Sequence, residues 1–140
     1  MIAGIIGAGA SGMAAALSAA RNVNAQIVLF ERQSRVGKKL QATGNGRCNL
    51  TNLYTTVDNY HGEEPAFVCD ALEQYGPEKI LDWFRELGLF TVAEPSGKVY
   101  PYSDHANSVV DILRLALEQP NIQLCTGFEV QKISKENNDF

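Results

Sequence analysis

The order of elements predicted within the first 31 residues constrains the fold of this chain most. The apolar run Ile2–Ile6 leads directly into a glycine-rich turn, Gly7-Ala8-Gly9-Ala10-Ser11-Gly12. The alanine-rich segment Met13–Ala20 follows and is typical of a closely packed helix. A second apolar run, Ile27–Phe30, then ends at Glu31. A strand, a glycine turn, a helix and a second strand in this order predict an α/β domain with a parallel sheet.

The small residues of the turn suit a dinucleotide. Gly7 permits the tight turn after the strand, Gly9 lets the backbone approach a pyrophosphate, and Gly12 lets helix and strand pack closely. The N–H groups at the helix start, which include those of Ala10 and Ser11, point toward the same place and favour an anion. The turn is therefore a candidate pyrophosphate site.

Glu31 lies 19 positions after Gly12, where a carboxylate accepts hydrogen bonds from a ribose diol. A carboxylate here also repels a 2′-phosphate. Taken alone, the glycine motif is weak, and an acidic residue at a strand end is typical of a solvated surface charge. The placement of the motif between a predicted strand and a predicted helix favours the dinucleotide site.

Charge and cysteine content exclude other classes of function. Twelve Lys and Arg against 16 Asp and Glu give a net charge of −4, so the basic stripe of nucleic-acid-binding proteins is missing. The three cysteines lack the short spacings of zinc sites, and neither histidine has a metal ligand at a suitable spacing, so we expect no metal site. An odd number of cysteines without such spacings indicates a reducing cytoplasm.

The first 20 residues carry no charged side chain, yet four glycines interrupt them and they contain no basic n-region. These features argue against a signal peptide and a membrane span, so we expect a soluble cytoplasmic protein with no membrane partner. Ser11 has no identifiable His partner and no Cys-x-x-Cys pair is present, so no catalytic residue is identified. Any redox chemistry must come from a bound cofactor.

A second glycine-rich stretch spans residues 37–52 and predicts a long ordered loop. Its Thr43-Gly44-Asn45-Gly46 sequence can adopt positive φ at several positions, which would turn successive N–H groups into a concavity suited to an anion. Arg47 would stand beside it as a donor fork. A surface loop with an Asn-Gly turn explains the same composition, and the residues alone leave both interpretations open.

The remaining pattern predicts a covering layer of helices, a hairpin and further strands. Periodicity and turn residues place these elements at Pro65–Tyr75 and Pro77–Leu87 (helices), Leu89–Ala93 and Lys98–Tyr102 (hairpin strands), Asp104/His105–Glu118 (helix), and Ile122–Cys125 and Phe128–Ile133 (strands). The last strand alternates apolar and polar residues and is expected to be half exposed.

Several of these stretches resemble the aminoacetone-oxidase/BaiN-like family of FAD-dependent flavoproteins. The resemblance is carried by the first glycine turn, by Glu31-Arg32 and by Gly37-Lys38-Lys39-Leu40. It is carried above all by Thr43-Gly44-Asn45-Gly46-Arg47-Cys48-Asn49-Leu50-Thr51-Asn52, and Gly97-Lys98-Val99-Tyr100-Pro101 with Ser103 matches as well. The match covers nearly the whole chain.

The resemblance implies a Rossmann-like FAD-binding domain of the two-dinucleotide-binding-domain flavoprotein type. It implies FAD as cofactor, NAD(P)H as a candidate electron donor, and a flavin-dependent oxidoreductase of unknown substrate. The cofactor residues that it implies are Gly7, Gly9, Ala10, Ser11, Gly12, Glu31, Arg32, Lys39, Gly44, Gly46, Arg47, Cys48 and the backbone of Val130, beside the adenine. A dinucleotide-binding module or truncated gene product without turnover is the alternative.

The chain departs from the resembled family in length. The resemblance implies that residues 1–140 form a partial FAD/NAD(P)-binding domain, without the substrate domain and the C-terminal part of the FAD fold. In the expected parallel sheet, Ile2–Ile6 lies between Ile27–Glu31 and strands that this chain does not encode, and Ile122–Cys125 lies beyond the second strand. The strand from Phe128 would begin a small antiparallel layer. We therefore expect unpaired sheet edges, self-association or marginal stability, and weak flavin affinity.

Overall fold

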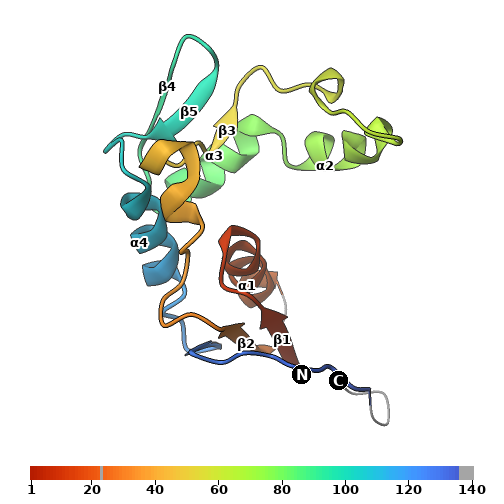
Figure 1. Ribbon diagram of the computed structural model, residues 1–140, viewed down its shortest axis with the longest axis vertical. Helices are drawn as coiled ribbons and strands as arrows, with labels where there is room; N and C mark the ends of the chain where they lie inside the picture. Colours follow the sequence, from red (N-terminus) through yellow and green to blue (C-terminus); the bar gives the residue numbers. More distant parts are fainter. Residues whose placement is uncertain (23, 136–140) are drawn as a thin grey trace. The chain divides into compact units, whose positions relative to one another are not determined.

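The computed structural model describes residues 1–22 and 24–135, which form two compact units. Unit 1 is discontinuous and contains Met1–Leu40 and Leu113–Phe140, whereas unit 2 is continuous and contains Gln41–Ile112. Helix α4 (Ala106–Ala116) crosses the boundary along the chain. Figure 1 shows the two groups of elements, and each unit is described below by itself.

Unit 1 contains a three-stranded parallel sheet in the order β1-β2-β6, of which Figure 1 labels β1 and β2. Ile5 of β1 pairs with Leu29 of β2, which in turn pairs with Leu124 of β6. The sheet therefore has the predicted order, with the second strand flanked by the first and by the strand near residue 122. Its elements are β1 (Ile2–Ile6), α1 (Ala10–Asn22), β2 (Gln26–Glu31) and β6 (Ile122–Thr126).

The core of unit 1 lies between helix α1 and strand β2. Met13, Ala16 and Leu17 recur at three- and four-residue spacing and are fully or almost fully buried, as the inner face of a helix requires. Ile27 and Leu29 alternate along β2 and are equally buried. Packing of this helix on the strand holds the glycine turn between them.

Unit 2 contains a small antiparallel sheet in the order β3-β5-β4. Strands β4 and β5 form the predicted hairpin, whereas β3 has two residues and was not predicted as a strand. The helix expected over Pro65–Tyr75 is divided into a 3₁₀ segment and a short α-helix. The elements are the 3₁₀ helices η1 (Leu40–Gly46), η2 (Val57–Asn59) and η3 (Pro65–Val68), helices α2 (Cys69–Gln74) and α3 (Pro77–Glu86), and strands β3 (Thr51–Asn52), β4 (Thr91–Ala93) and β5 (Lys98–Pro101).

The strand predicted over Phe128–Ile133 is wrong, because the described residues after β6 form no strand. Gly127 N–H instead donates to the carbonyl of Gln33, and Phe128 N–H donates to that of Glu31. The small antiparallel layer is built from β3, β5 and β4 rather than from this segment. Alternation of apolar and polar residues indicates a strand only where a second strand is available, and the described part of unit 1 offers none here.

No helix among the described residues is long and apolar enough to span a membrane.

Candidate dinucleotide-binding site

The three glycines of the first turn have the environments that the motif predicts. Gly7 has a φ of 92° and its N–H donates to the carbonyl of Phe30 at 2.7 Å, so the turn is joined to the end of β2. A Cβ on Gly12 would overlap the carbonyl oxygen of Gly7, so the helix approaches the turn too closely for any side chain. A Cβ on Gly9 would meet nothing within 4 Å. Packing within the chain therefore does not require a glycine at position 9, and the space beside Gly9 is open.

Helix α1 begins at Ala10, directly after this open position. The N–H of Met13 donates to the carbonyl of Gly9 at 3.0 Å. Ala10, Ser11 and Gly12 lie before Met13 in the first turn of the helix. Backbone hydrogen bonding within a helix supplies no acceptor for the N–H groups of its first turn. With the positive end of the helix dipole they make a place for an anion next to Gly9.

Glu31 ends β2 and is held against the glycine turn by both of its carboxylate oxygens. Oε2 accepts a hydrogen bond from the N–H of Ala8 at 2.9 Å, and Oε1 accepts one from the N–H of Gln33 at 2.8 Å. The side chain is half-buried, so it is fixed without being removed from solvent. A carboxylate has about four lone-pair positions, so two further acceptor positions remain for a diol.

A cavity of about 360 Å³ lies at this edge of unit 1. Two cations at its wall have partners within the unit: Lys38 Nζ lies 3.3 Å from Gln33 Oε1, and Arg32 Nη1 lies 3.9 Å from Glu129 Oε1. Basic side chains around a single carboxylate give a wall suited to a ligand that carries both phosphates and hydroxyls. The cavity is lined by Ala8, Gly9, Glu31, Arg32, Gln33, Gly37, Lys38 and Lys39.

Val130 does not line this cavity, and its side chain is exposed.

Three residues that line the cavity were not predicted from the sequence as site residues, namely Gln33, Gly37 and Lys38. Gly37 is tied to the turn, because its N–H donates to the carbonyl of Ala8 at 2.9 Å. Position alone could have indicated Gln33, since the two residues that follow a strand-end carboxylate are within reach of its oxygens.

Residues 43–48 of the second glycine-rich stretch lie in unit 2 and are called the second glycine-rich loop here. Positive φ was predicted within residues 43–46 and is found at Gly44 (55°), Asn45 (55°) and Gly46 (82°), whereas Thr43 has a φ of −75°. Cys48, which was not predicted to, also has a positive φ, of 60°. The loop also bonds to itself, because Cys48 N–H donates to the carbonyl of Thr43 at 3.0 Å. It is an ordered, doubled-back segment, as the sequence indicated.

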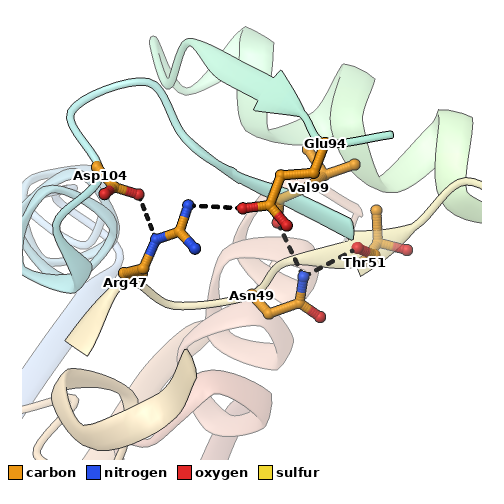
Figure 2. A network of polar contacts seen from close by, with 6 residues as sticks. All are labelled: Arg47, Asn49, Thr51, Glu94, Val99 and Asp104. Carbon is orange, nitrogen blue, oxygen red and sulfur yellow. Dashed lines mark hydrogen bonds and ion pairs between the residues drawn. The ribbon is translucent and has the colours of Figure 1, made fainter. Parts of the chain in front are cut away.

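Arg47 does not stand free beside this loop. Its Nε donates to Asp104 Oδ1 at 2.5 Å and its Nη2 donates to Glu94 Oε1 at 2.9 Å (Figure 2). The guanidinium carbon lies 3.9 Å from the centre of the Tyr100 ring. The hydrogen bond with Asp104, and then that with Glu94, raise the pKa of Arg47 above its ordinary value.

Cys48 is the buried member of the loop, with 2% of its surface exposed. Burial raises the pKa of its thiol, and a hydrogen bond with Thr43 partly offsets this by lowering it. A thiol held in its neutral form is a poor nucleophile and a poor metal ligand. Its surroundings are those of a packing residue.

Comparisons with known proteins agree with this geometry. The family model described as "HI0933-like protein Rossmann domain" matches residues 2–140. The chain is 44% identical over 98% of its length to 3-dehydro-bile acid delta(4,6)-reductase of Clostridium scindens, of which it covers 34%. It is 29% identical over 97% of its length to ribosomal RNA dihydrouridine synthase of Escherichia coli, again covering 34%. The chain thus spans about a third of the length of these relatives.

A solved structure of THI4 from Thermovibrio ammonificans has the same fold. It matches with a TM-score of 0.56 over 89% of this chain and 37% of the THI4 chain, at 12% sequence identity. At this identity the likeness concerns the fold alone. The Rossmann motif, its open glycine and the family match over residues 2–140 lead to one conclusion: the chain belongs to the HI0933-like family of flavoproteins and forms its FAD-binding Rossmann domain.

Proposed function

We propose that unit 1 binds the ADP half of FAD at the first glycine turn. The observation that carries this proposal is the fixed carboxylate of Glu31, held at the rim of the turn by the N–H groups of Ala8 and Gln33. Its remaining lone pairs would accept the hydroxyls of the adenine ribose. The N–H groups of Ala10, Ser11 and Gly12 would then hold the pyrophosphate, which approaches the backbone at Gly9.

Further residues of the site are proposed from charge and from the resemblance. Arg32 and Lys39 are exposed cations at the cavity and would lie beside the phosphates or the adenine. From the resemblance we also propose that the backbone of Val130 contacts the adenine and that the loop from Gly44 to Cys48 contributes to the flavin's surroundings.

We infer that the complete protein is a flavin-dependent reductase of a carbon–carbon double bond. One relative is named a delta(4,6)-reductase of a 3-dehydro-bile acid, and another a dihydrouridine synthase. Both names describe addition of hydrogen to an unsaturated ring that also carries a carbonyl group. FAD supplies hydride transfer when it is bound, and NAD(P)H is the proposed electron donor. This chain contributes the binding and orientation of the dinucleotide.

Titration of the purified chain with FAD, followed by flavin fluorescence, tests the proposal. Replacing Glu31 by Ala should weaken FAD binding by roughly 1.5–3 kcal/mol, the usual scale for hydrogen bonds to a charged group. Glu118→Ala is the matched control, since Glu118 is an exposed partner of Arg114 on the surface of the protein. Equal FAD affinity in the Glu31→Ala variant and the wild type would count against the site.

A further inference from the structure

We propose that Arg47 is a positioning residue that holds the second glycine-rich loop in its conformation, and that it does not bind an anionic group of the cofactor. The inference deepens the proposed function, which places this loop near FAD. It differs from the expectation drawn from the sequence, in which the guanidinium stood beside the loop as a donor for an anion. All the residues that carry the argument belong to unit 2.

The donors of the Arg47 fork are already engaged on two sides. Asp104 accepts from Nε and Glu94 accepts from Nη2, and Figure 2 shows the guanidinium between the two carboxylates. Tyr100 lies against the face of the same group, 3.9 Å from its carbon. A planar guanidinium bound at its edges and covered on a face is fixed in orientation.

These partners come from both ends of one hairpin. Glu94 follows β4 and begins the turn toward β5, where its carbonyl accepts from the N–H of Gly97 at 2.9 Å. Asp104 lies after β5, and its N–H donates to the carbonyl of Pro101 at 2.9 Å. Arg47 therefore ties the glycine-rich loop to the turn before β5 and to the turn after it.

The loop needs such a restraint because its backbone is strained. Three non-glycine residues of the described chain have positive φ, namely Asn45 at 55°, Cys48 at 60° and Asp104 at 58°. Two of them lie in the loop, and the third is a carboxylate partner of Arg47. Such conformations persist only where the surrounding contacts over-determine them. The two ion pairs of Arg47 are contacts of that kind.

The charge of the cluster argues against an anionic ligand. One guanidinium faces two carboxylates, so the group carries one net negative charge when all three are ionised. A phosphate brought to Arg47 would meet Glu94 and Asp104 as well, and like charges at this range repel. A phosphate-binding site, in contrast, carries a net positive charge on the protein side.

Hydrogen exchange of the amides of residues 43–48, measured without FAD, tests the restraint directly. Arg47→Lys keeps the charge but loses the fork, and Asp104→Asn keeps a residue that tolerates positive φ but loses the charge. In both variants the amides of residues 43–48 should exchange about tenfold faster than in the wild type. Arg85→Lys is the control, because Arg85 forms an exposed ion pair with Asp82 on α3, and it should leave the loop unchanged. Unchanged exchange in both test variants would overturn the proposal.

The direction in which Asp104→Asn changes the affinity for FAD distinguishes a positioning residue from a ligand. If Arg47 bound an anionic group of the cofactor, Asp104→Asn would remove a carboxylate that competes for the guanidinium, and FAD would bind more tightly. A positioning role predicts weaker FAD binding and an altered visible spectrum of the flavin in Asp104→Asn, with ADP affinity unchanged. Tighter FAD binding would refute the inference. Wild-type protein that binds no FAD would refute the proposed function instead, and the exchange measurement would still decide the role of Arg47.

Discussion

Gly9 and Gly12 belong to the same glycine-rich turn, yet each requires the absence of a side chain for a different reason. A side chain on Gly9 would enter open space, whereas one on Gly12 would collide with the Gly7 carbonyl. We expect Gly9→Val to fold normally and to lose FAD binding, because its side chain occupies the pyrophosphate position. We expect Gly12→Ala to lose stability by about 1–3 kcal/mol through overpacking. Thermal unfolding and FAD titration of both variants separate the two effects.

Gly9→Val that retains FAD would contradict the site, and Gly12→Ala as stable as the wild type would contradict the close approach of helix and turn. The wild-type chain serves as the reference for both measurements.

Residues that act within one motif could be predicted from the sequence. The tasks of Gly7 and Gly12 follow from a fixed spacing in a short segment, so the turn and its close packing were predicted. The partners of Arg47 could not be predicted in this way, because Glu94 and Asp104 lie 47 and 57 positions further along the chain. Contacts over such separations depend on the fold, which a local pattern does not contain.

Among the elements, those with many periodic residues were predicted well. Helix α1, helix α3 and strands β1 and β2 have long apolar runs or stripes. Strand β3 has only two residues, which is too few to show an alternating sequence pattern. It is a strand because its residues pair with those of β5. The segment from Phe128 to Ile133 is the reverse case, in which a strand pattern has no partner among the described residues.

Asn49 helps to hold β3 against β5, and its replacement tests the small sheet. Its Nδ2 donates to the carbonyl of Thr51 at 3.3 Å and to that of Val99 at 3.2 Å (Figure 2). Asn49→Asp places an acceptor opposite two carbonyl oxygens and should lower the free energy of unfolding by about 1–2 kcal/mol. Asn49→Ala, which only removes the donor, should cost less. Urea unfolding measures both, and equal stability of Asn49→Asp and wild type would show that these bonds do not hold the sheet.

At the scale of the whole molecule, strand β1 leaves apolar surface uncovered. Among the described residues it pairs with β2 alone, and Ile2 and Ile6 are 76% and 54% exposed. An edge strand with apolar side chains is a site for association. We therefore expect the chain to associate as its concentration rises, measured by size-exclusion chromatography with light scattering.

Ile2→Lys should reduce this association, because a charge on an edge strand opposes pairing with another strand. Leu115→Lys is the control, since Leu115 is similarly exposed on α4. A wild-type chain that stays monomeric at all concentrations would show that the exposed edge is harmless.

The division into two compact units is a property of the molecule that no local sequence pattern indicated. The order of the parallel sheet was predicted correctly, and the assignment of residues 1–140 to one partial FAD/NAD(P)-binding domain stays a prediction. In the sheet of unit 1, Ile27 of β2 pairs with Ile122 of β6. Along the sequence, the whole of unit 2 lies between these two strands.

This interrupted order has a consequence for synthesis on the ribosome. Strand β2 emerges early, but its neighbour β6 emerges only after the whole of unit 2 has been made. Unit 2 has all its strands in one continuous stretch and can fold while translation continues, whereas the nascent β2 must wait with one side unpaired. The glycine turn at the end of β1 is thus translated before unit 2, yet the sheet that supports it can close only after unit 2 has been made.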